Sequence, residues 1–103
     1  MIGKAFKKGA IPLETKICVY ILLCRDGTLY TGWTNNLAQR LDRHNSGRGA
    51  KYTRARRPVE LVYVEYLEDK SSALKREYQI KQMTRVQKDE LLAQSSAKTL
   101  IEQ

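Results

Sequence analysis

Hydrophobic residues are concentrated in three short segments of the chain, which polar and basic stretches separate. Residues 17–24, ICVYILLC, form a continuous apolar run rich in β-branched side chains, which is typical of a strand buried on both faces. Residues 28–33, TLYTGW, and residues 59–67, VELVYVEYL, have the composition of two further strands. Pro58 can open the last strand but cannot occupy a central position in a sheet, because proline has no amide hydrogen to donate. The pattern therefore predicts three strands.

Signals for helix initiation lie between and after these strands. Asn35 and Asn36 are favourable N-caps for a helix over residues 37–45. An aspartate and two serines offer caps for a helix over about residues 72–83, and a shorter helix is expected over residues 87–93. The expected order is β-β-α-β-α-α. It corresponds to an α/β (α+β) fold, with a three-stranded, mainly antiparallel sheet flanked by helices.

The chain of 103 residues is long enough for one domain, and no internal repeat or low-complexity block divides it. Residues 1–15 are basic and contain glycine and proline without a sustained period, so we expect a flexible basic N-terminal arm. We place the domain at residues 16–95. Residues 96–103 carry no strong structural signal and are expected to be a C-terminal tail.

The charge balance indicates a polyanionic partner. Lysine and arginine number 19 against 11 acidic residues, which gives a formal net charge of +8. Nucleic acid and an anionic membrane surface are the two partners that fit such a charge on so small a domain. A generically basic soluble protein is the alternative. No apolar run approaches the roughly 20 residues of a membrane span, so we expect a soluble protein with no membrane association.

The two cysteines and the single histidine limit other chemistry. Cys18 and Cys24 fall in one predicted strand, where six residues span roughly 20 Å. That separation is well beyond the Cα distance of about 7 Å that a disulfide can bridge. Reduced cysteines are consistent with a cytoplasmic location. With one histidine in the chain, a zinc cluster is not expected.

The loop between the first two strands decides where Tyr20 and Tyr30 point. A two-residue Asp-Gly turn would place the two tyrosines on opposite faces of the sheet. A three-residue loop, with Gly27 in the left-handed conformation, would place them on one face, roughly 7–8 Å apart as diagonal neighbours. Tyr20 would then lie opposite Gly32, which would leave open space above the ring for a ligand. The alternative is that both tyrosines only pack in the sheet.

Arg40 and His44 lie one helical turn apart on the first predicted helix, at the edge of the face that Leu37 and Leu41 direct toward the core. A cation and a titratable imidazole at this position could bind a phosphate and relay a proton. The alternative is structural. His44 would then act as a favourable cation at the helix C-terminus, and Arg40 would extend along the surface.

Glu77 falls inside an apolar arc of the second long helix. Its neighbours on that arc include Ala73, Leu74 and Ile80. A carboxylate in this position needs a partner, because burying an unpaired charge is costly. Lys81, one turn later, is the structural candidate. A divalent cation is the functional one, since Mg²⁺ is commonly held by one or two carboxylates with water and phosphate oxygens.

A basic loop connects the first helix to the third strand, and no acidic residue lies between Asp42 and Glu60. Such a loop can neutralise backbone phosphates without reading base sequence. A solvated basic loop is the equally weighted alternative. Its basic residues are Arg48, Lys51, Arg54, Arg56 and Arg57, with Tyr52 among them.

The order and spacing of these residues resemble the GIY-YIG nuclease family. Cys18-Val19-Tyr20 stands where that family has Gly-Ile-Tyr, and Tyr30-Thr31-Gly32 matches its Tyr-Ile-Gly triplet. The resemblance extends to about Met83 and is closest to small stand-alone bacterial members and to the structure-specific branch with a histidine one turn after the arginine. The further matching positions are Thr34, Leu37, Arg40, Leu41, His44 and, at the family's metal-binding glutamate, Glu77.

The resemblance implies a metal-dependent endonuclease that hydrolyses phosphodiester bonds of DNA, branched, single-stranded or damaged, in repair or recombination. It implies that Glu77 holds one Mg²⁺ or Mn²⁺ ion, which binds the scissile phosphate and stabilises the leaving oxygen. Tyr20 or Tyr30 would position and help deprotonate the attacking water, with Tyr20 favoured. A free tyrosine has a pKa of about 10, so a cation must lower it. Arg40 would do so while neutralising transition-state charge, and His44 would relay the proton.

The sequence departs from the family pattern in several places. The first triplet lacks its Gly and Ile, and the asparagine that some members carry after the last helix has no counterpart. Trp33 stands where some members have a basic residue that contacts the site, so we group Trp33 and Lys81 with the basic loop as nucleic-acid-binding residues. No second domain is evident, so we expect a monomer with a protein partner that supplies substrate targeting. A non-catalytic nucleic-acid-binding module and a protein–protein adaptor are the competing interpretations.

Overall fold

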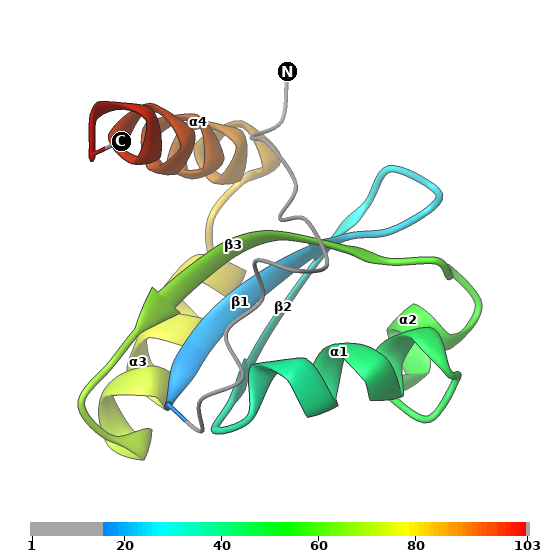
Figure 1. Ribbon diagram of the computed structural model, residues 1–103. Coiled ribbons are helices and arrows are strands. Elements are labelled where there is room, and N and C mark those ends of the chain that lie inside the picture. The colour runs from blue at the N-terminus through cyan, green and yellow to red at the C-terminus, as the bar shows by residue number, and fades with distance from the viewer. Residues whose placement is uncertain (1–15, 103) are drawn as a thin grey trace.

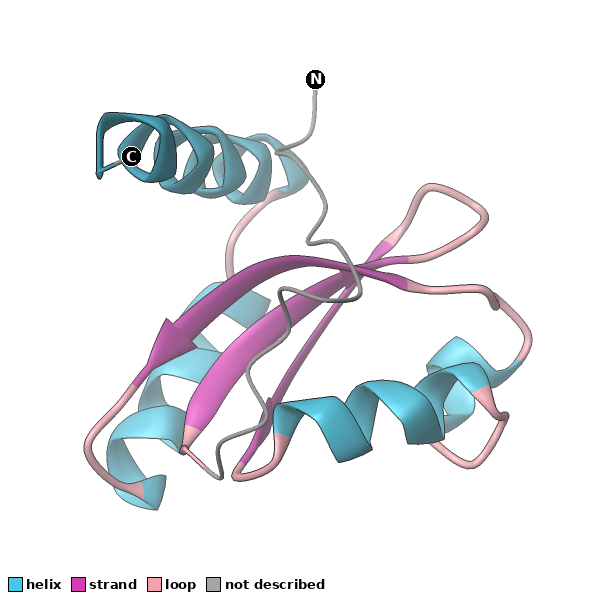
Figure 2. Cartoon of the chain, viewed as in Figure 1, coloured by secondary structure: helices cyan, strands magenta, loops and turns pink. Residues whose placement is uncertain are grey.

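The three predicted strands form one antiparallel sheet in the computed structural model, which describes residues 16–102 (Figures 1 and 2). The strand order is β2-β1-β3, with β1 (Cys18–Leu23) paired antiparallel to both β2 (Leu29–Thr34) and β3 (Glu60–Tyr66). The central strand β1 is almost entirely buried, as its unbroken apolar run predicts. Pro58 precedes the edge strand β3 and so interrupts no ladder. The predicted fold class is confirmed.

Within residues 16–102, four helices accompany the sheet: α1 (Leu37–Asn45), α2 (Lys51–Arg54), α3 (Lys70–Lys81) and α4 (Arg85–Glu102). The bounds of α1 are those predicted, because the Asn36 side chain accepts a hydrogen bond from the backbone amide of Gln39 at 3.2 Å and caps the helix. In the part of the chain that the structure describes, no helix is long and apolar enough to cross a membrane.

The other three helices differ from the prediction. The single turn α2 lies inside the segment expected to be a loop. Helix α3 starts at Lys70 because the Asp69 side chain caps it, accepting a hydrogen bond from the amide of Ser72 at 2.8 Å. Helix α4 extends to Glu102 instead of ending near residue 93, so the segment expected as a tail continues the helix. The expected N-terminal arm, residues 1–15, lies outside the described residues.

The sheet separates two hydrophobic clusters. Helix α1 covers one face, where Leu37 and Leu41 pack with the side chains of Tyr20 and Leu22. Helices α3 and α4 cover the other, where Ala73, Ile80, Leu91 and Leu92 pack with Val19 and Ile21. Figure 2 shows α1 and α3 on opposite sides of the strands. Leu74, which we expected on the core face of α3, is 42% exposed, so that expectation is wrong.

The hairpin adopts the three-residue loop that the tyrosine argument required. Gly27 has a φ of 85° and donates its amide hydrogen to the carbonyl oxygen of Cys24 at 2.9 Å. The resulting register places Tyr20 opposite Gly32 and Leu22 opposite Tyr30, so both tyrosines are on the α1 face. Both cysteines are buried and free, in agreement with the sequence analysis.

Candidate active site

Three aromatic rings converge on the α1 face of the sheet. Tyr20 comes from β1, Tyr30 from β2, and His44 from the last turn of α1. The ring centroids of Tyr20 and Tyr30 are 6.5 Å apart, and those of Tyr20 and His44 are 5.8 Å apart. Tyr30 and His44 are closer still, at 5.2 Å with an edge-on arrangement. Three of the residues that the sequence analysis singled out therefore form one cluster.

A directional chain of hydrogen bonds runs through this cluster. The Tyr20 hydroxyl lies 2.9 Å from Nε2 of His44, and Nδ1 of His44 lies 2.8 Å from Oγ1 of Thr53. Thr53 donates its one hydroxyl hydrogen to the carbonyl oxygen of Ala50 at 3.0 Å, so it accepts from Nδ1–H of His44. Nε2 is then an acceptor, and the Tyr20 hydroxyl donates to it. Sequence reasoning missed Thr53, because nothing in the local pattern distinguishes it from the threonines elsewhere in the chain.

His44 is neutral at neutral pH. Its side chain is 1% exposed, and this burial, together with the charges of Arg40 and Arg43, lowers its pKa from 6.5 to about 4. This shift disfavours the structural alternative of a charged histidine at the helix C-terminus. The unprotonated Nε2 accepts the hydrogen bond of the Tyr20 hydroxyl.

Two glycines permit the close packing around the chain. A Cβ at Gly49 would lie 2.5 Å from Nδ1 of His44, and one at Gly32 would lie 2.6 Å from the Tyr20 hydroxyl oxygen. Both distances are too short for non-bonded atoms, so a side chain at either position would displace the cluster. The expectation that Gly32 leaves open space for a ligand is therefore wrong. The Tyr20 ring and hydroxyl lie directly against Gly32 and occupy that space.

A cavity of about 190 Å³ opens beside the cluster. Burial raises the pKa of Tyr20 and of Tyr30, and the guanidinium of Arg40 acts against burial at both. The charge of Arg40 also contributes to the lowered pKa of His44, so Arg40 lies within electrostatic range of all three rings. The residues that line the cavity are Tyr30, Arg40, Arg43, His44, Arg48, Gly49 and Ala50.

Glu77 lies on the helix that covers the other face of the sheet, within electrostatic range of Tyr30. It lies on α3, which packs against the edge strand β2, and its side chain is 18% exposed. Its charge raises the pKa of Tyr30, which places the carboxylate within electrostatic range of that hydroxyl. The Lys81 ammonium lies 3.6 Å from Oε2 of Glu77, which is an ion pair but too long for a strong hydrogen bond.

The residues present fit a divalent ion that few protein side chains hold. Among residues 16–102, no group of three or more histidine, cysteine or acidic side chains could enclose a metal. One half-buried carboxylate with loosely engaged oxygens suits Mg²⁺ or Mn²⁺, which retains water and takes further oxygens from a phosphate. Glu77 is such a carboxylate.

Two arginines of the basic loop make contacts within the protein. Arg56 donates to Asp26 at 3.0 Å and lies 3.9 Å from the ring centroid of Tyr52, which in turn stacks on Tyr30 at 6.0 Å. Arg57 donates to the carbonyl oxygens of Arg54 and Asn45. These two arginines hold the loop in place. The other predicted basic residues of the loop are exposed, namely Arg48, Lys51 and Arg54.

Two of the residues predicted to bind nucleic acid, Trp33 and Lys81, lie away from the basic loop. Trp33 packs in the cluster on the α3 face, with the Lys70 ammonium 5.4 Å from its ring centroid, so it is not beside the tyrosines. Its position follows from strand alternation, because Trp33 is an odd number of residues from Tyr30. Lys81 lies next to Glu77 rather than on the basic loop.

Comparisons with known proteins agree with the geometry. A family model described as the GIY-YIG catalytic domain matches residues 16–89. A UPF0213 protein from Clostridium perfringens is 59% identical over 80 residues, which cover 78% of this chain and 86% of that protein. A UPF0213 protein from Syntrophus aciditrophicus is 56% identical over 82 residues, covering 79% of this chain and 94% of that protein.

Two solution NMR structures have a similar fold. One is the UPF0213 protein of Bacillus halodurans, with 41% identity and a TM-score of 0.54, covering 79% of this chain and 86% of that one. The other is a protein of E. faecalis, with 41% identity and a TM-score of 0.56, covering 91% of this chain and 90% of that one.

The lowered pKa of His44 predicts a specific dependence of stability on pH. An unfolded imidazole has a pKa of about 6.5, whereas folded His44 titrates at about 4. Only the unfolded state binds this proton between those values, so its contribution to stability is complete above about pH 6.5 and is lost as the pH falls toward 4. Between pH 7.5 and 4.5, wild type should lose about 2–3 kcal/mol more unfolding free energy than His44→Gln.

Urea unfolding at the two pH values, followed by the fluorescence of Trp33, measures this difference. Carboxylates that titrate in the same range contribute equally to both proteins and cancel in the comparison. Parallel loss of stability in wild type and His44→Gln would show that His44 is not held neutral by burial.

Proposed function

Because the chain belongs to the GIY-YIG catalytic domain family, we propose that it is a divalent-metal-dependent endonuclease that hydrolyses phosphodiester bonds of DNA. The observation that carries the proposal is the hydrogen-bond chain from Tyr20 through His44 to Thr53, beside a cavity that Arg40 lines. Protein packing alone does not require a buried neutral histidine with a fixed tautomer. Such a histidine can serve a hydrolase that must remove a proton from water.

The chain supplies a route for that proton. Tyr20 is 1% exposed and does not itself line the cavity, so its hydroxyl must open toward the cavity for the reaction. As the oxygen of the attacking water then forms its bond to phosphorus, the water gives a proton to the Tyr20 oxygen. Tyr20 gives its own proton to Nε2 of His44 in the same step. Tyr20 therefore never carries a full negative charge, which matters because burial raises its pKa. The His44 imidazolium retains its Nδ1–H bond to Thr53 and returns the proton to solvent after the P–O bond to the leaving group has broken.

Arg40 and Tyr30 have positioning and electrostatic roles. Both line the cavity, where the scissile phosphate would be held. The guanidinium of Arg40 can donate hydrogen bonds to phosphate oxygens, and it neutralises the charge that builds on them in the transition state. Tyr30 faces the same cavity and orients the water toward Tyr20. Thr53 is a positioning residue, because it acts only through the tautomer of His44.

Glu77 would hold the metal ion. A bound Mg²⁺ or Mn²⁺ supplies Lewis-acid polarisation of the phosphate and stabilises the leaving oxygen. Glu77 does not line the cavity, but its charge acts on Tyr30, which does. An ion held by Glu77 on this side would act on a phosphate in the cavity together with Arg40. Lys81 would neutralise Glu77 in the absence of the ion and shift toward a phosphate in its presence.

Glu77→Gln should abolish metal-dependent cleavage while leaving the fold intact. The substitution keeps the side-chain shape but removes the charge that holds the ion, and we expect a loss of on the order of a hundredfold to a thousandfold in kcat. The assay incubates purified protein with single-stranded, branched and duplex DNA, with and without Mg²⁺ or Mn²⁺. Glu90→Gln, an exposed acid on α4, is the matched control and should cut like wild type.

Three outcomes are informative. Cutting by wild type and Glu90→Gln but not by Glu77→Gln supports the enzyme. Equal trace cutting by all three proteins identifies a contaminant and refutes it. DNA binding without any metal-dependent cutting would show that the domain is a non-catalytic nucleic-acid-binding module.

The two tyrosines should differ in their contribution. Tyr20→Phe removes the donor to His44 and with it the proton route, so kcat should fall by about a hundredfold or more. Tyr30→Phe leaves that route intact and should lower kcat by only about tenfold, with a larger effect on KM. Single-turnover cleavage measures both, and thermal unfolding confirms that each variant is folded. A larger kcat loss in Tyr30→Phe would assign the proton transfer to Tyr30 instead.

A further inference from the structure

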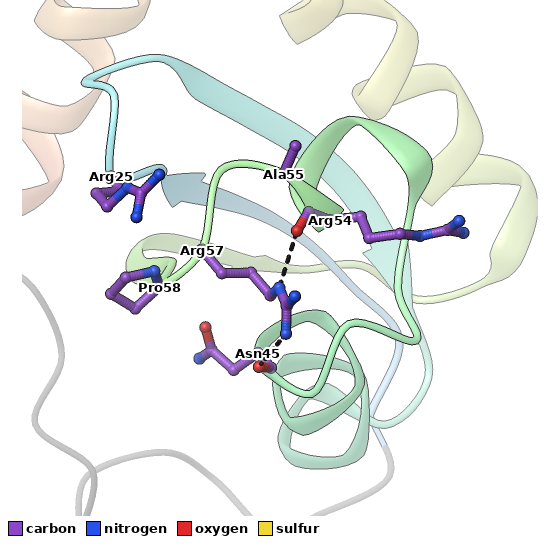
Figure 3. A pocket seen from close by; sticks show the side chains of 6 residues that line it. All are labelled: Arg25, Asn45, Arg54, Ala55, Arg57 and Pro58. Carbon is purple, nitrogen blue, oxygen red and sulfur yellow. Dashed lines mark hydrogen bonds between the residues drawn. The ribbon is translucent and has the colours of Figure 1, made fainter.

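A second basic recess lies on the other side of the α1 C-terminus from the catalytic cavity. It has a volume of about 520 Å³, and no acidic residue lines it. In Figure 3, Arg57 occupies its centre with the guanidinium directed at Asn45, Arg25 and Pro58 lie to one side, and the Arg54 side chain extends away from Arg25. The two guanidinium groups that face this space are therefore those of Arg25 and Arg57.

Hydrogen bonds to backbone carbonyl groups hold the exposed Arg57 side chain in place. Its Nε donates to the Arg54 carbonyl oxygen at 2.8 Å and its Nη1 to the Asn45 carbonyl oxygen at 3.4 Å. A Cβ at Gly47 would lie 2.9 Å from Nη1, so the guanidinium packs directly on the backbone of a glycine with a φ of 84°. An arginine with a fixed fork loses little conformational entropy when it binds an anion.

Arg25 is attached to the same loop through the backbone. Its amide donates to the carbonyl oxygen of Arg56 at 3.0 Å, and the next residue, Asp26, accepts from Nε of Arg56 at 3.0 Å. These bonds fasten the hairpin loop to the basic loop. Asp26 is occupied by Arg56 and by Thr28, and in the described part of the chain the Arg25 guanidinium has no ion pair. The recess therefore has excess positive charge that no nearby carboxylate neutralises.

We propose that the recess formed by Arg25 and Arg57 binds a backbone phosphate of the DNA strand, away from the scissile bond. This inference rests on the proposed nuclease function. The two sites are adjacent in the chain, since His44 lines the catalytic cavity and Asn45 lines the recess. At α2 the N-cap residue Ala50 lines the catalytic cavity, and the last residue, Arg54, lines the recess. A strand that passes over α2 would place one phosphate in each.

The recess has a consequence for substrate length. A small phosphodiester such as bis(p-nitrophenyl) phosphate reaches only the catalytic cavity, whereas a long oligonucleotide reaches both. Contacts in the recess carry no base information, so they should strengthen binding of every sequence. They should also add to the salt dependence of binding, by about 0.7 in the slope of log K against log salt for each phosphate on a single strand.

The test compares Arg25→Gln with Lys75→Gln, which removes an exposed charge from α3, and with Arg25→Lys, which keeps the charge at position 25. Arg57 is left unchanged because it holds the basic loop on α1. Two quantities are measured. One is the ratio of kcat/KM on a long single-stranded oligonucleotide to that on bis(p-nitrophenyl) phosphate, and the other is the salt dependence of oligonucleotide binding by fluorescence anisotropy.

Arg25→Gln should lower the ratio by about two- to fivefold, the loss expected for one exposed charge contact, and reduce the salt slope by about 0.7. Lys75→Gln should change neither quantity, and Arg25→Lys should retain the slope. Equal changes in Arg25→Gln and Lys75→Gln, with wild-type cleavage intact, would refute the recess and leave the nuclease standing. Wild type that cleaves neither substrate in the presence of Mg²⁺ or Mn²⁺ would refute the proposed function.

Discussion

The buried hydrogen bonds of His44 are the interaction on which the site depends. They join the central strand, through Tyr20, to the last turn of α1 and to the single turn of α2, through Thr53. Because His44 is almost fully buried, losing either partner would leave a ring nitrogen unsatisfied at a cost of about 1–3 kcal/mol. The same hydrogen bonds that position β1, α1 and α2 also set the tautomer of His44. Stability and the orientation of Nε2 toward the Tyr20 hydroxyl therefore have one physical origin.

The second constraint is electrostatic and concerns the edge strand β2. Arg40 reaches the cavity from α1 on one face of the sheet, and Glu77 approaches from α3 on the other. The two charges act in opposite directions on the pKa of Tyr30, so both are within electrostatic range of this side chain. An edge strand is suited to this arrangement, because side chains from both faces can extend past it without crossing the sheet. A phosphate with a divalent ion carries both signs of charge and matches a site built in this way.

Features that local interactions determine could be predicted from the sequence, whereas features that tertiary packing determines could not. Local chemistry defined the hairpin, because a glycine with positive φ at Gly27 determines the register that places the tyrosines together. Glu77 was singled out because a carboxylate in an apolar arc breaks a periodic pattern, and its side chain is 18% exposed although Leu74 of that arc faces solvent. Thr53 was not, since it lies on a four-residue helix that packing rather than propensity stabilises. Gly32 was predicted to leave space for a ligand, and that prediction was wrong. The strand pairing places Gly32 opposite Tyr20, but the size of the Tyr20 ring decides that the ring itself fills the space beside Gly32.

The central claim is that His44 is held as the neutral Nδ1–H tautomer, with Nε2 ready to accept the proton of Tyr20. The chain contains one histidine, so a nitrogen-15 NMR spectrum of the imidazole ring has a single pair of signals to interpret. Burial and the bond to Thr53 predict a protonated Nδ1 and an unprotonated Nε2 at pH 7, and a titration midpoint at about 4. An Nε2–H tautomer, or a midpoint at the unperturbed value of about 6.5, would contradict it.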